Sequence, residues 1–404
     1  MSGANGASGD APDPFAPAKL GPVHLRNRIL KAATFEGMTP DALVTDQLID
    51  FHRRHAAGGV GVSTVAYLAV APEGRTHAEA IWLRDGAVAG LRDLTDAIHA
   101  EGAAAGAQIG HAGPVANGRS NRSPALAPSR GFSPLSMRPI RAVTETELER
   151  VTMDYGRAAR LAVAGGFDVI EVHLGHNYLP SSFLSPALNR RKDRWGGSIE
   201  NRVRFPRQIV RAVRDVVGDQ VAVIAKFNMD DGYPGGLKPE DSLVAAGLLE
   251  EDGCLDAIEL TGGSSFANPM YLFRGDAPLE EFGETLPQPL KTGFKLFGHR
   301  FMPSYPFEEA YFLETARRFR ERLSMPLILL GGINNRSTIE MAMGEGFEFV
   351  AMARALLHDP ELVTKMQTGE QTAGECIHCN KCMPTIYTGT RCVEELATRE
   401  LTRR

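Results

Sequence analysis

Two histidines and a tyrosine follow a buried strand in the segment EVHLGHNYLPSSFLSPALNRRKDRWGGSIENRVRF, residues 171–205. The strand reads FDVIEVH, and His173, His176 and Tyr178 lie within six residues at its end. This concentration of imidazole and phenol groups marks the first candidate catalytic site, because strand ends carry the chemistry in folds built from parallel strands.

Two further polar residues stand at the ends of apolar runs. Gln108 follows AAAGA, and its carboxamide offers both a donor and an acceptor to the imide edge of a heterocycle. A loop glutamine that is satisfied by its surroundings is the alternative. Lys226 follows the apolar run VAVIA, at the end of a buried strand. Lysine is seldom buried without a specific role, and this one could stand beside an atom that becomes negative during a reaction.

Near the C-terminus, two apolar runs end in candidate phosphate-binding turns. LLGGINNRS contains Gly331 and Gly332, and FVAMARALL contains Ala353 and Arg354. Glycines allow the backbone N–H groups to approach a phosphate closely. A tight turn without a ligand is the alternative explanation of the double glycine.

The elements that must position these residues are short apolar strands that alternate with helices. The helix that begins at Thr144 carries a capping box with Glu147 and ends at Gly165 and Gly166. Eight such units predict a (β/α)8 TIM barrel, with an open doubly wound sheet as the alternative. The strand candidates are residues 28–33, 61–69, 103–109, 167–172, 221–227, 255–260, 327–332 and 347–352.

A barrel of this kind needs about 250 of the 404 residues, so the surplus is expected in loops and tails. Two long connections, 110–143 and 262–306, are candidate lids or partner surfaces. We expect a disordered tail over residues 1–13, the barrel over 14–370 and a Cys-rich extension over 371–404. The chain therefore combines a barrel with long loop insertions and a short C-terminal extension.

The composition excludes several classes of protein. A net charge of −5 argues against a nucleic-acid partner, and no apolar run reaches the roughly 20 residues that span a membrane. The first residues lack the basic start and apolar segment of a signal peptide. We therefore expect a cytoplasmic protein, whose cysteines are free thiols, metal ligands or redox groups rather than disulfides.

The segment after His173 resembles the old yellow enzyme family of FMN-dependent NAD(P)H:flavin oxidoreductases and ene-reductases. The shared pattern is His-x-x-His/Asn-x-Tyr-Leu, Phe-Leu-x-Pro, Asn-x-Arg-x-Asp, an aromatic before Gly-Gly, and Ser-x-Glu-Asn-Arg. The similarity continues in LRNRIL, GGVGVSTVAYLAVAPEGR, GAQIGHAG and the two phosphate turns, and it covers about residues 14–370.

The resemblance implies roles for the three catalytic candidates. His173 and His176 would hydrogen-bond the oxygen of an electrophilic small molecule stacked on the flavin, and Tyr178 would donate a proton. NAD(P)H would reduce the flavin first, in the same pocket, and an activated C=C bond would then receive the hydride by ping-pong kinetics. Relatives of this kind often self-associate, so a homo-oligomer is expected.

The resemblance also assigns the FMN contacts. Gln108 would meet the pyrimidine edge, and Lys226 stands where relatives usually have arginine near N1 and O2. The segment beside the isoalloxazine and the phosphate cradle would be formed by Ala32, Ala33, Thr34, Gly331, Gly332, Ala353 and Arg354.

Some positions depart from the family pattern and leave the substrate open. Tyr67 stands where ene-reductases often have a small residue, so it would narrow the pocket or line a cation box, or pack as an ordinary aromatic. Pro114 replaces a common arginine, and Ala353 a common glycine. An amine or demethylating dehydrogenase with FMN and an Fe–S relay is one alternative. A flavin electron-transfer module that needs a partner reductase is another.

The C-terminal stretch ECIHCNKCMPTIYTGTRCV holds four cysteines with ferredoxin-like spacing. Multidomain relatives such as dienoyl-CoA reductase and trimethylamine dehydrogenase carry a [4Fe–4S] cluster at a similar place. A structural zinc ion and unligated thiols are the alternatives. The candidate ligands are Cys376, Cys379, Cys382 and Cys392, whereas Cys254 is predicted to be an ordinary buried thiol.

Overall fold

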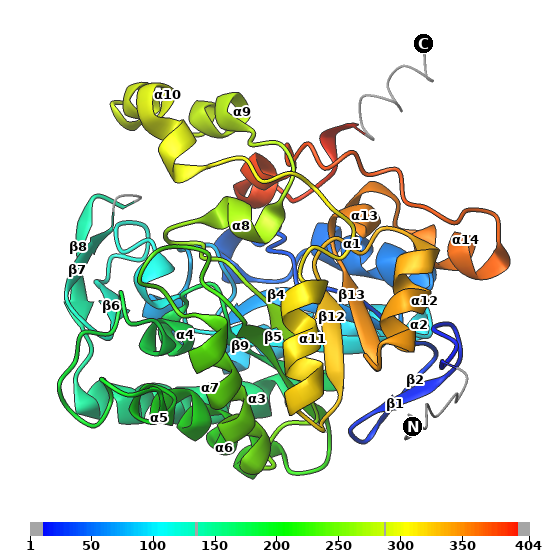
Figure 1. Ribbon diagram of the computed structural model, residues 1–404, viewed down its shortest axis with the longest axis horizontal. Helices are drawn as coiled ribbons and strands as arrows, with labels where there is room; N and C mark the ends of the chain where they lie inside the picture. The colour runs from blue at the N-terminus through cyan, green and yellow to red at the C-terminus, as the bar shows by residue number, and fades with distance from the viewer. Residues whose placement is uncertain (1–10, 134–135, 287, 395–404) are drawn as a thin grey trace, which may run out of the picture.

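A closed barrel of eight parallel strands forms the centre of the molecule (Figure 1). This computed structural model describes residues 11–133, 136–286 and 288–394. The barrel confirms the predicted (β/α)8 fold, and the strands begin within two residues of the predicted positions. They are β3 (Ile29–Lys31), β4 (Val62–Ala69), β5 (Ala104–Gly110), β9 (Val169–Leu174), β10 (Ala222–Asn228), β11 (Ala257–Thr261), β12 (Leu327–Leu330) and β13 (Phe349–Met352).

Amphipathic helices surround the barrel and bury their apolar stripes against the outer faces of the strands. Helix α3 begins after Thr144, whose side chain and that of Glu147 form the predicted capping box, and it ends before Gly165. The longer helices are α1 (Asp46–Ala57), α2 (Val88–Ala100), α3 (Glu145–Ala164), α6 (Arg204–Val217), α7 (Pro239–Glu251), α11 (Leu313–Arg322) and α12 (Arg336–Gly344). The shorter ones are α4 (Leu179–Leu184), α5 (Ile199–Arg202), α13 (Arg354–His358) and α14 (Leu362–Thr368).

Apolar side chains fill the N-terminal end of the barrel. The hairpin of β1 (Ala18–Leu20) and β2 (Val23–Leu25) precedes the first barrel strand. Its Leu20 and Leu25 belong to the same buried cluster as residues near the start of the strands, such as Phe349. Because this end is closed and apolar, the polar side chains that the strands carry lie toward the opposite, C-terminal rim.

The two long connections fold into substructures of their own. The first, 110–143, contains a small sheet of β6 (Ala125–Ala127), β8 (Arg138–Ala142) and β7 (Gly131–Ser133), in that order. The second, 262–306, contains α8 (Pro269–Phe273), α9 (Leu279–Glu284) and α10 (Leu290–Phe301). In Figure 1 these three helices lie above the barrel, beside the red C-terminal segment.

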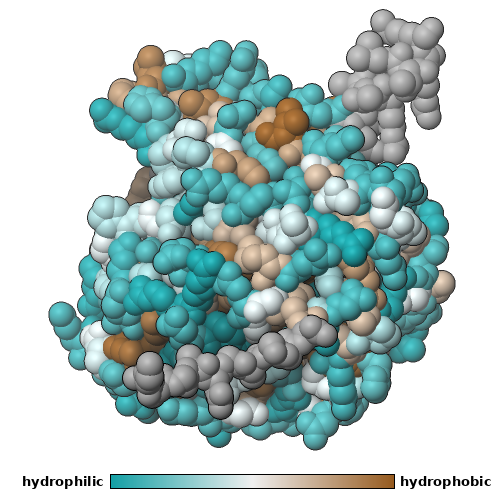
Figure 2. Space-filling model, turned by 45° about the vertical axis from the view of Figure 1, so that its right-hand side comes forward, coloured by the Kyte–Doolittle hydropathy of each residue, from teal (hydrophilic) through white to brown (hydrophobic). Residues whose placement is uncertain are grey.

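The Cys-rich segment is tied to the insertion and to the barrel rim. Met270, Met302 and Met383 form one buried cluster that joins the two segments. Figure 2 shows a mostly hydrophilic face with apolar residues gathered near the top, in the region of the insertion. No helix in the described part of the chain is long and apolar enough to cross a membrane.

Candidate active site

The three catalytic candidates lie together where β9 leads into α4. The ring centroids of His173 and His176 are 5.0 Å apart, and those of His173 and Tyr178 are 4.3 Å apart. A tight turn produces this arrangement, because His176 and Asn177 adopt positive φ angles of 57° and 60°. Asn228 from the neighbouring strand accepts a hydrogen bond of 3.0 Å from the His176 amide and holds the turn.

Both histidines are neutral at neutral pH. Burial lowers the pKa of His173 well below its usual range, and the electrostatic interactions with its neighbours His176 and Lys226 lower it further. Burial and Lys226 lower the pKa of His176 to about 3. His176 Nε2 lies 3.0 Å from Thr261 Oγ1, whereas His173 Nδ1 is buried and has no hydrogen-bond partner in the described structure. The pair can therefore donate hydrogen bonds without acting as an acid.

Tyr67 joins this group from β4. The ladder between β4 and β5 is irregular between Val65 and Leu68, and irregularities of this kind redirect a side chain. Tyr67 is 4% exposed and its ring packs edge-on against Tyr178, with centroids 5.4 Å apart. Its hydroxyl donates a hydrogen bond to the carbonyl of Gly74, so the phenol is held in place beside the catalytic candidates.

A buried network of charged groups links the predicted flavin contacts Gln108 and Lys226. Gln108 Nε2 donates a 2.5 Å hydrogen bond to Glu171, and Lys226 Nζ lies 3.4 Å from the other oxygen of the same carboxylate. Lys226 also donates to Glu259, which stands opposite it in the β10–β11 ladder. Sequence reasoning missed both carboxylates, although each is the one charged residue in its strand.

The charges in this network perturb one another. Burial raises the pKa of Glu259 to about 8; Lys226 opposes the rise and Glu171 adds to it. Burial alone would lower the pKa of Lys226, but the two carboxylates outweigh it, and the pKa is raised. Lys226 is therefore a permanent cation within the barrel.

At the exit of β3, the three predicted flavin neighbours follow the strand directly. Ala32 is buried and its amide donates to the carbonyl of Met352, and Ala33 and Thr34 are half-buried. Thr34 Oγ1 accepts a 2.9 Å hydrogen bond from Lys31, which also pairs with Glu36 at 2.8 Å. This second buried ion pair was not predicted.

The predicted phosphate turns lie at the ends of β12 and β13. Gly331 and Gly332 have φ angles of +106° and +75°, and a Cβ on either would lie within 3 Å of the Tyr311 ring. Only glycine fits there without strain. Arg354 donates to the side chain of Asn380 at 2.5 Å and to the carbonyl of Arg274 at 2.8 Å. The insertion and the Cys-rich segment therefore hold this guanidinium, which the sequence did not indicate.

The residues at this rim fit an FMN group. They supply a carboxamide, two cations and one double-glycine turn at the ends of barrel strands, and the buried His173 Nδ1 lacks a partner. These are the groups that a ring imide, an anionic ring and a phosphate require. Gln108, Lys226 and Arg354 would hold such a group, after exchanging some of the contacts that they make here.

The four candidate metal ligands share one environment. Burial raises the pKa of Cys382 to about 12, with Arg354 opposing and the other three thiols adding to the rise. His358 Nδ1 lies 3.4 Å from Cys392 Sγ. Within the described residues, however, no three or more His, Cys, Asp or Glu side chains converge as metal ligands. Cys254 is buried, as predicted.

Comparison with known proteins places the chain in a family. Residues 13–254 match the NADH:flavin oxidoreductase / NADH oxidase family. The 4,4'-dithiodibutanoate disulfide reductase of Rhodococcus erythropolis is 58% identical over 97% of this chain and 98% of its own length. The metal reductase of Desulforamulus reducens is 32% identical over 92% of this chain. The matched region covers 52% of the metal reductase, so the present chain spans about half of that protein.

Solved structures agree on the fold. A 2-naphthoyl-CoA reductase superposes with a TM-score of 0.79 at 25% identity, over 94% of this chain and 56% of that one. The old yellow enzyme homologue of Zymomonas mobilis superposes with a TM-score of 0.72 at 20% identity, over 95% and 98% of the two chains. The predicted resemblance is thus confirmed: the chain belongs to the NADH:flavin oxidoreductase / NADH oxidase family and is an FMN-dependent oxidoreductase that takes electrons from NAD(P)H.

Proposed function

We propose that this protein reduces a small organic disulfide that carries carboxylate groups, with NAD(P)H as the electron source. The observation that carries the proposal is the 58% identity to a 4,4'-dithiodibutanoate disulfide reductase over nearly the full length of both chains. In the overall reaction NAD(P)H, one proton and R–S–S–R give NAD(P)+ and two R–SH. Two electrons break the S–S bond, and each sulfur gains one hydrogen.

The four rings of His173, His176, Tyr178 and Tyr67, which pack together at the strand ends, suit this chemistry. When bound, FMN supplies hydride transfer between NAD(P)H and the substrate. The neutral His173 and His176 donate hydrogen bonds to the atom on which negative charge develops. Tyr178 gives its proton to the sulfur that leaves when the S–S bond breaks, since a tyrosine hydroxyl can serve as a general acid at neutral pH. Tyr67 narrows the pocket beside Tyr178.

We propose that FMN is held by the residues that the family resemblance implies. Gln108 and Lys226 would hold the ring end of bound FMN, and Arg354 would hold its phosphate. The buried cation of Lys226 would favour negative charge on the ring, and Glu171 orients the Gln108 carboxamide through its hydrogen bond. The remaining contacts are Ala32, Ala33, Thr34, Gly331, Gly332 and Ala353.

Reduction of an activated C=C bond is the second candidate function. A pair of neutral imidazole donors beside a phenol can polarise a carbonyl oxygen and protonate the α carbon, so the same side chains fit an enone. Oxidation of an amine is the remaining alternative. It is supported by the similarity to the N,N-dimethylglycine/sarcosine dehydrogenase of Chromohalobacter salexigens, which is 27% identical over 95% of this chain. A cytoplasmic location and self-association stay predictions.

Anaerobic turnover tests the function. Protein with bound FMN is reduced with NADPH or NADH and then mixed with 4,4'-dithiodibutanoate or with cyclohexenone. We expect the flavin absorbance to bleach with the nicotinamide and to return with the disulfide, with two thiols formed per NAD(P)H. If the flavin absorbance returns with cyclohexenone but not with the disulfide, the substrate is an activated C=C bond and the disulfide proposal fails. Bleaching by dimethylglycine in place of NAD(P)H would support the oxidative alternative.

We also propose that Cys376, Cys379, Cys382 and Cys392 hold a [4Fe–4S] cluster. The spacing of the thiols and their shared surroundings support it. Anaerobically purified protein should contain about four iron atoms per chain, and Cys382→Ala should lose most of them while keeping FMN. Zinc in place of iron, or neither metal, would contradict the proposal.

A further inference from the structure

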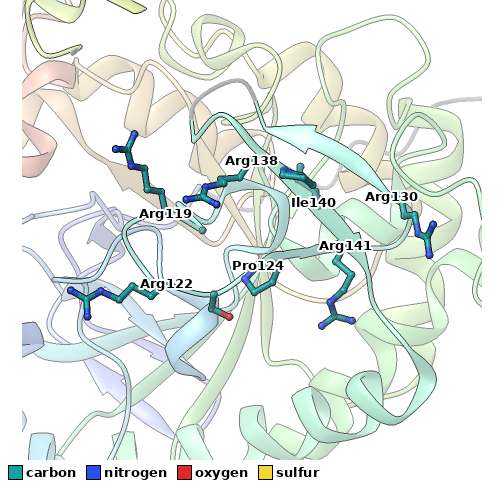
Figure 3. A pocket seen from close by; sticks show the side chains of 10 residues that line it. Arg119, Arg122, Pro124, Arg130, Arg138, Ile140 and Arg141 are labelled. Carbon is teal, nitrogen blue, oxygen red and sulfur yellow. The ribbon is translucent and has the colours of Figure 1, made fainter. Parts of the chain in front are cut away.

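Polar groups from β10, from β11 and from the loop after β11 converge on the buried His176. This convergence distinguishes the residue from the charged groups at the surface. A surface cavity of about 680 Å³ beside β8, for example, is lined by arginines whose side chains extend in different directions (Figure 3). The groups around His176 are directed at one residue instead, and each of them bonds a different part of it.

The backbone of His176 is held on both sides. Its amide donates a 3.0 Å hydrogen bond to Asn228 Oδ1, and its carbonyl accepts a 3.2 Å hydrogen bond from the amide of Ser265. Asn228 is fixed in turn, because its Nδ2 donates a 2.9 Å hydrogen bond to the buried carboxylate of Asp231. These contacts set the place of His176 but leave its ring to be oriented by other groups.

A single side chain in the described structure forms a hydrogen bond with the ring of His176. Thr261 Oγ1 lies 3.0 Å from Nε2, and the threonine is fully buried at the end of β11. Unlike His173 Nδ1, the Nδ1 of His176 is not fully buried, so it can reach a bound molecule. Because His176 is neutral, one ring nitrogen carries the hydrogen and the other carries a lone pair. The direction of the Thr261 hydrogen bond therefore decides whether Nδ1 is a donor or an acceptor.

The surroundings of Thr261 favour donation by its hydroxyl group. A hydroxyl has one hydrogen to donate and two lone pairs that can accept. Within the described parts of the chain, His176 Nε2 is the one hydrogen-bond partner of Thr261 Oγ1. If the ring donated to this oxygen, the hydroxyl hydrogen would be buried without an acceptor, which is unfavourable. If the hydroxyl donates to the ring, no hydrogen at this contact lacks an acceptor.

We propose that Thr261 is a positioning residue that donates its hydroxyl hydrogen to His176 Nε2 and so keeps the ring hydrogen on Nδ1. In this form His176 presents an N–H group to the molecule that reacts beside Tyr178, as the stabilisation of a developing negative charge requires. In the opposite form Nδ1 presents a lone pair, which repels negative charge. The role in the reaction rests on the proposed function, whereas the location of the ring hydrogen does not.

Nuclear magnetic resonance locates the ring hydrogen directly. The protein with bound oxidised FMN is labelled with 15N-histidine, and long-range 1H–15N correlation spectra distinguish protonated from unprotonated ring nitrogens. The signals of His176 are assigned by their loss in His176→Asn. We expect the wild-type protein to carry the hydrogen on Nδ1 and none on Nε2. A hydrogen on Nε2 would overturn the proposal, because the hydroxyl of Thr261 would then be the acceptor.

Variants of Thr261 test whether its hydroxyl is the cause. Thr261→Val removes the hydroxyl and keeps the branched shape, whereas Thr261→Ser keeps the hydroxyl. Thr95→Val is the matched control, because it removes a fully buried hydroxyl that donates to the carbonyl of Gly165, in the outer layer of the fold. We expect only Thr261→Val to move hydrogen from Nδ1 to Nε2 of His176. An unchanged spectrum of this variant would contradict the proposal. Equal FMN content and circular dichroism verify that the variants fold.

The oxidative half-reaction tests the role of Thr261 in the chemistry. In anaerobic stopped-flow absorbance, we expect Thr261→Val to slow this step by about 10-fold, the effect of one misdirected hydrogen bond. Thr261→Ser and Thr95→Val should slow it by less than about two-fold. A displaced ring hydrogen with an unchanged rate would overturn the positioning role. If the wild type reduces neither 4,4'-dithiodibutanoate nor cyclohexenone, the proposed function fails, and the spectra alone decide whether Thr261 places the hydrogen.

Discussion

Tyr178→Phe is expected to slow the oxidative half-reaction by roughly 10²- to 10⁴-fold, the usual contribution of a positioned general acid. The variant keeps the ring that packs against His173 at 4.3 Å and against Tyr67 at 5.4 Å, and loses only the proton donor. The neighbouring histidines cannot replace it, since burial keeps both neutral. The reductive half-reaction with NAD(P)H needs no proton from this residue and should change by less than about three-fold.

Anaerobic stopped-flow absorbance of the flavin measures the two steps separately. Tyr155→Phe is the matched control, because it removes a buried phenol hydroxyl from α3, in the outer layer of the fold. An equal loss in both half-reactions would point to a damaged cofactor site instead. An unchanged oxidative rate would remove Tyr178 from the proposed mechanism and leave water or another group as the proton source.

The barrel was predictable because each of its strands has a recognisable pattern in the local sequence. A buried parallel strand is a short apolar run, and the run predicted at 221–227 is β10, Ala222–Asn228. The capping box of α3 was equally local, since Thr144 and Glu147 are three residues apart. The gathering of Tyr67 with the β9 residues followed from the fold, because the C-terminal ends of barrel strands meet at one rim.

What escaped prediction depends on contacts between distant segments. Glu259 stands opposite Lys226 only in the β10–β11 register, which no local pattern reveals. Arg354 meets Asn380 because the Cys-rich segment folds back over the rim. The small sheet of β6, β7 and β8 lies in the connection 110–143, whose sequence shows no clear strand periodicity. A local pattern fixes an element, but the neighbours of a side chain depend on how the elements pack.

Lys226→Met is expected to lower the free energy of unfolding by about 3–5 kcal/mol, because it leaves buried carboxylates without their cation. The lysine is 2% exposed, and Glu171 and Glu259 are each 1% exposed, so water cannot replace the lost charge. Methionine matches the length of the lysine stem, and the loss therefore reports charge more than packing. Urea unfolding in saturating FMN measures the effect.

The loss should grow with pH. Already in the wild type, the pKa of Glu259 is about 8 against an ordinary value of 4.5, so its contribution to stability is fully present below about 4.5 and is lost as the pH rises to about 8. Without the cation that opposes the rise, Glu259 must take up a proton on folding up to a higher pH, so each pH unit above 4.5 lowers the stability further. We therefore expect a larger destabilisation at pH 8.5 than at pH 6.

The double variant Lys226→Met/Glu259→Gln tests the electrostatic cause. The amide has the shape of the carboxyl group but no charge to neutralise, so it should recover part of the lost stability, most clearly at pH 8.5. If the single variant is equally destabilised at both pH values, or the double variant recovers nothing, the loss comes from packing. The two carboxylates would then be hydrated in the folded protein, and Lys226 would be free to serve the cofactor alone.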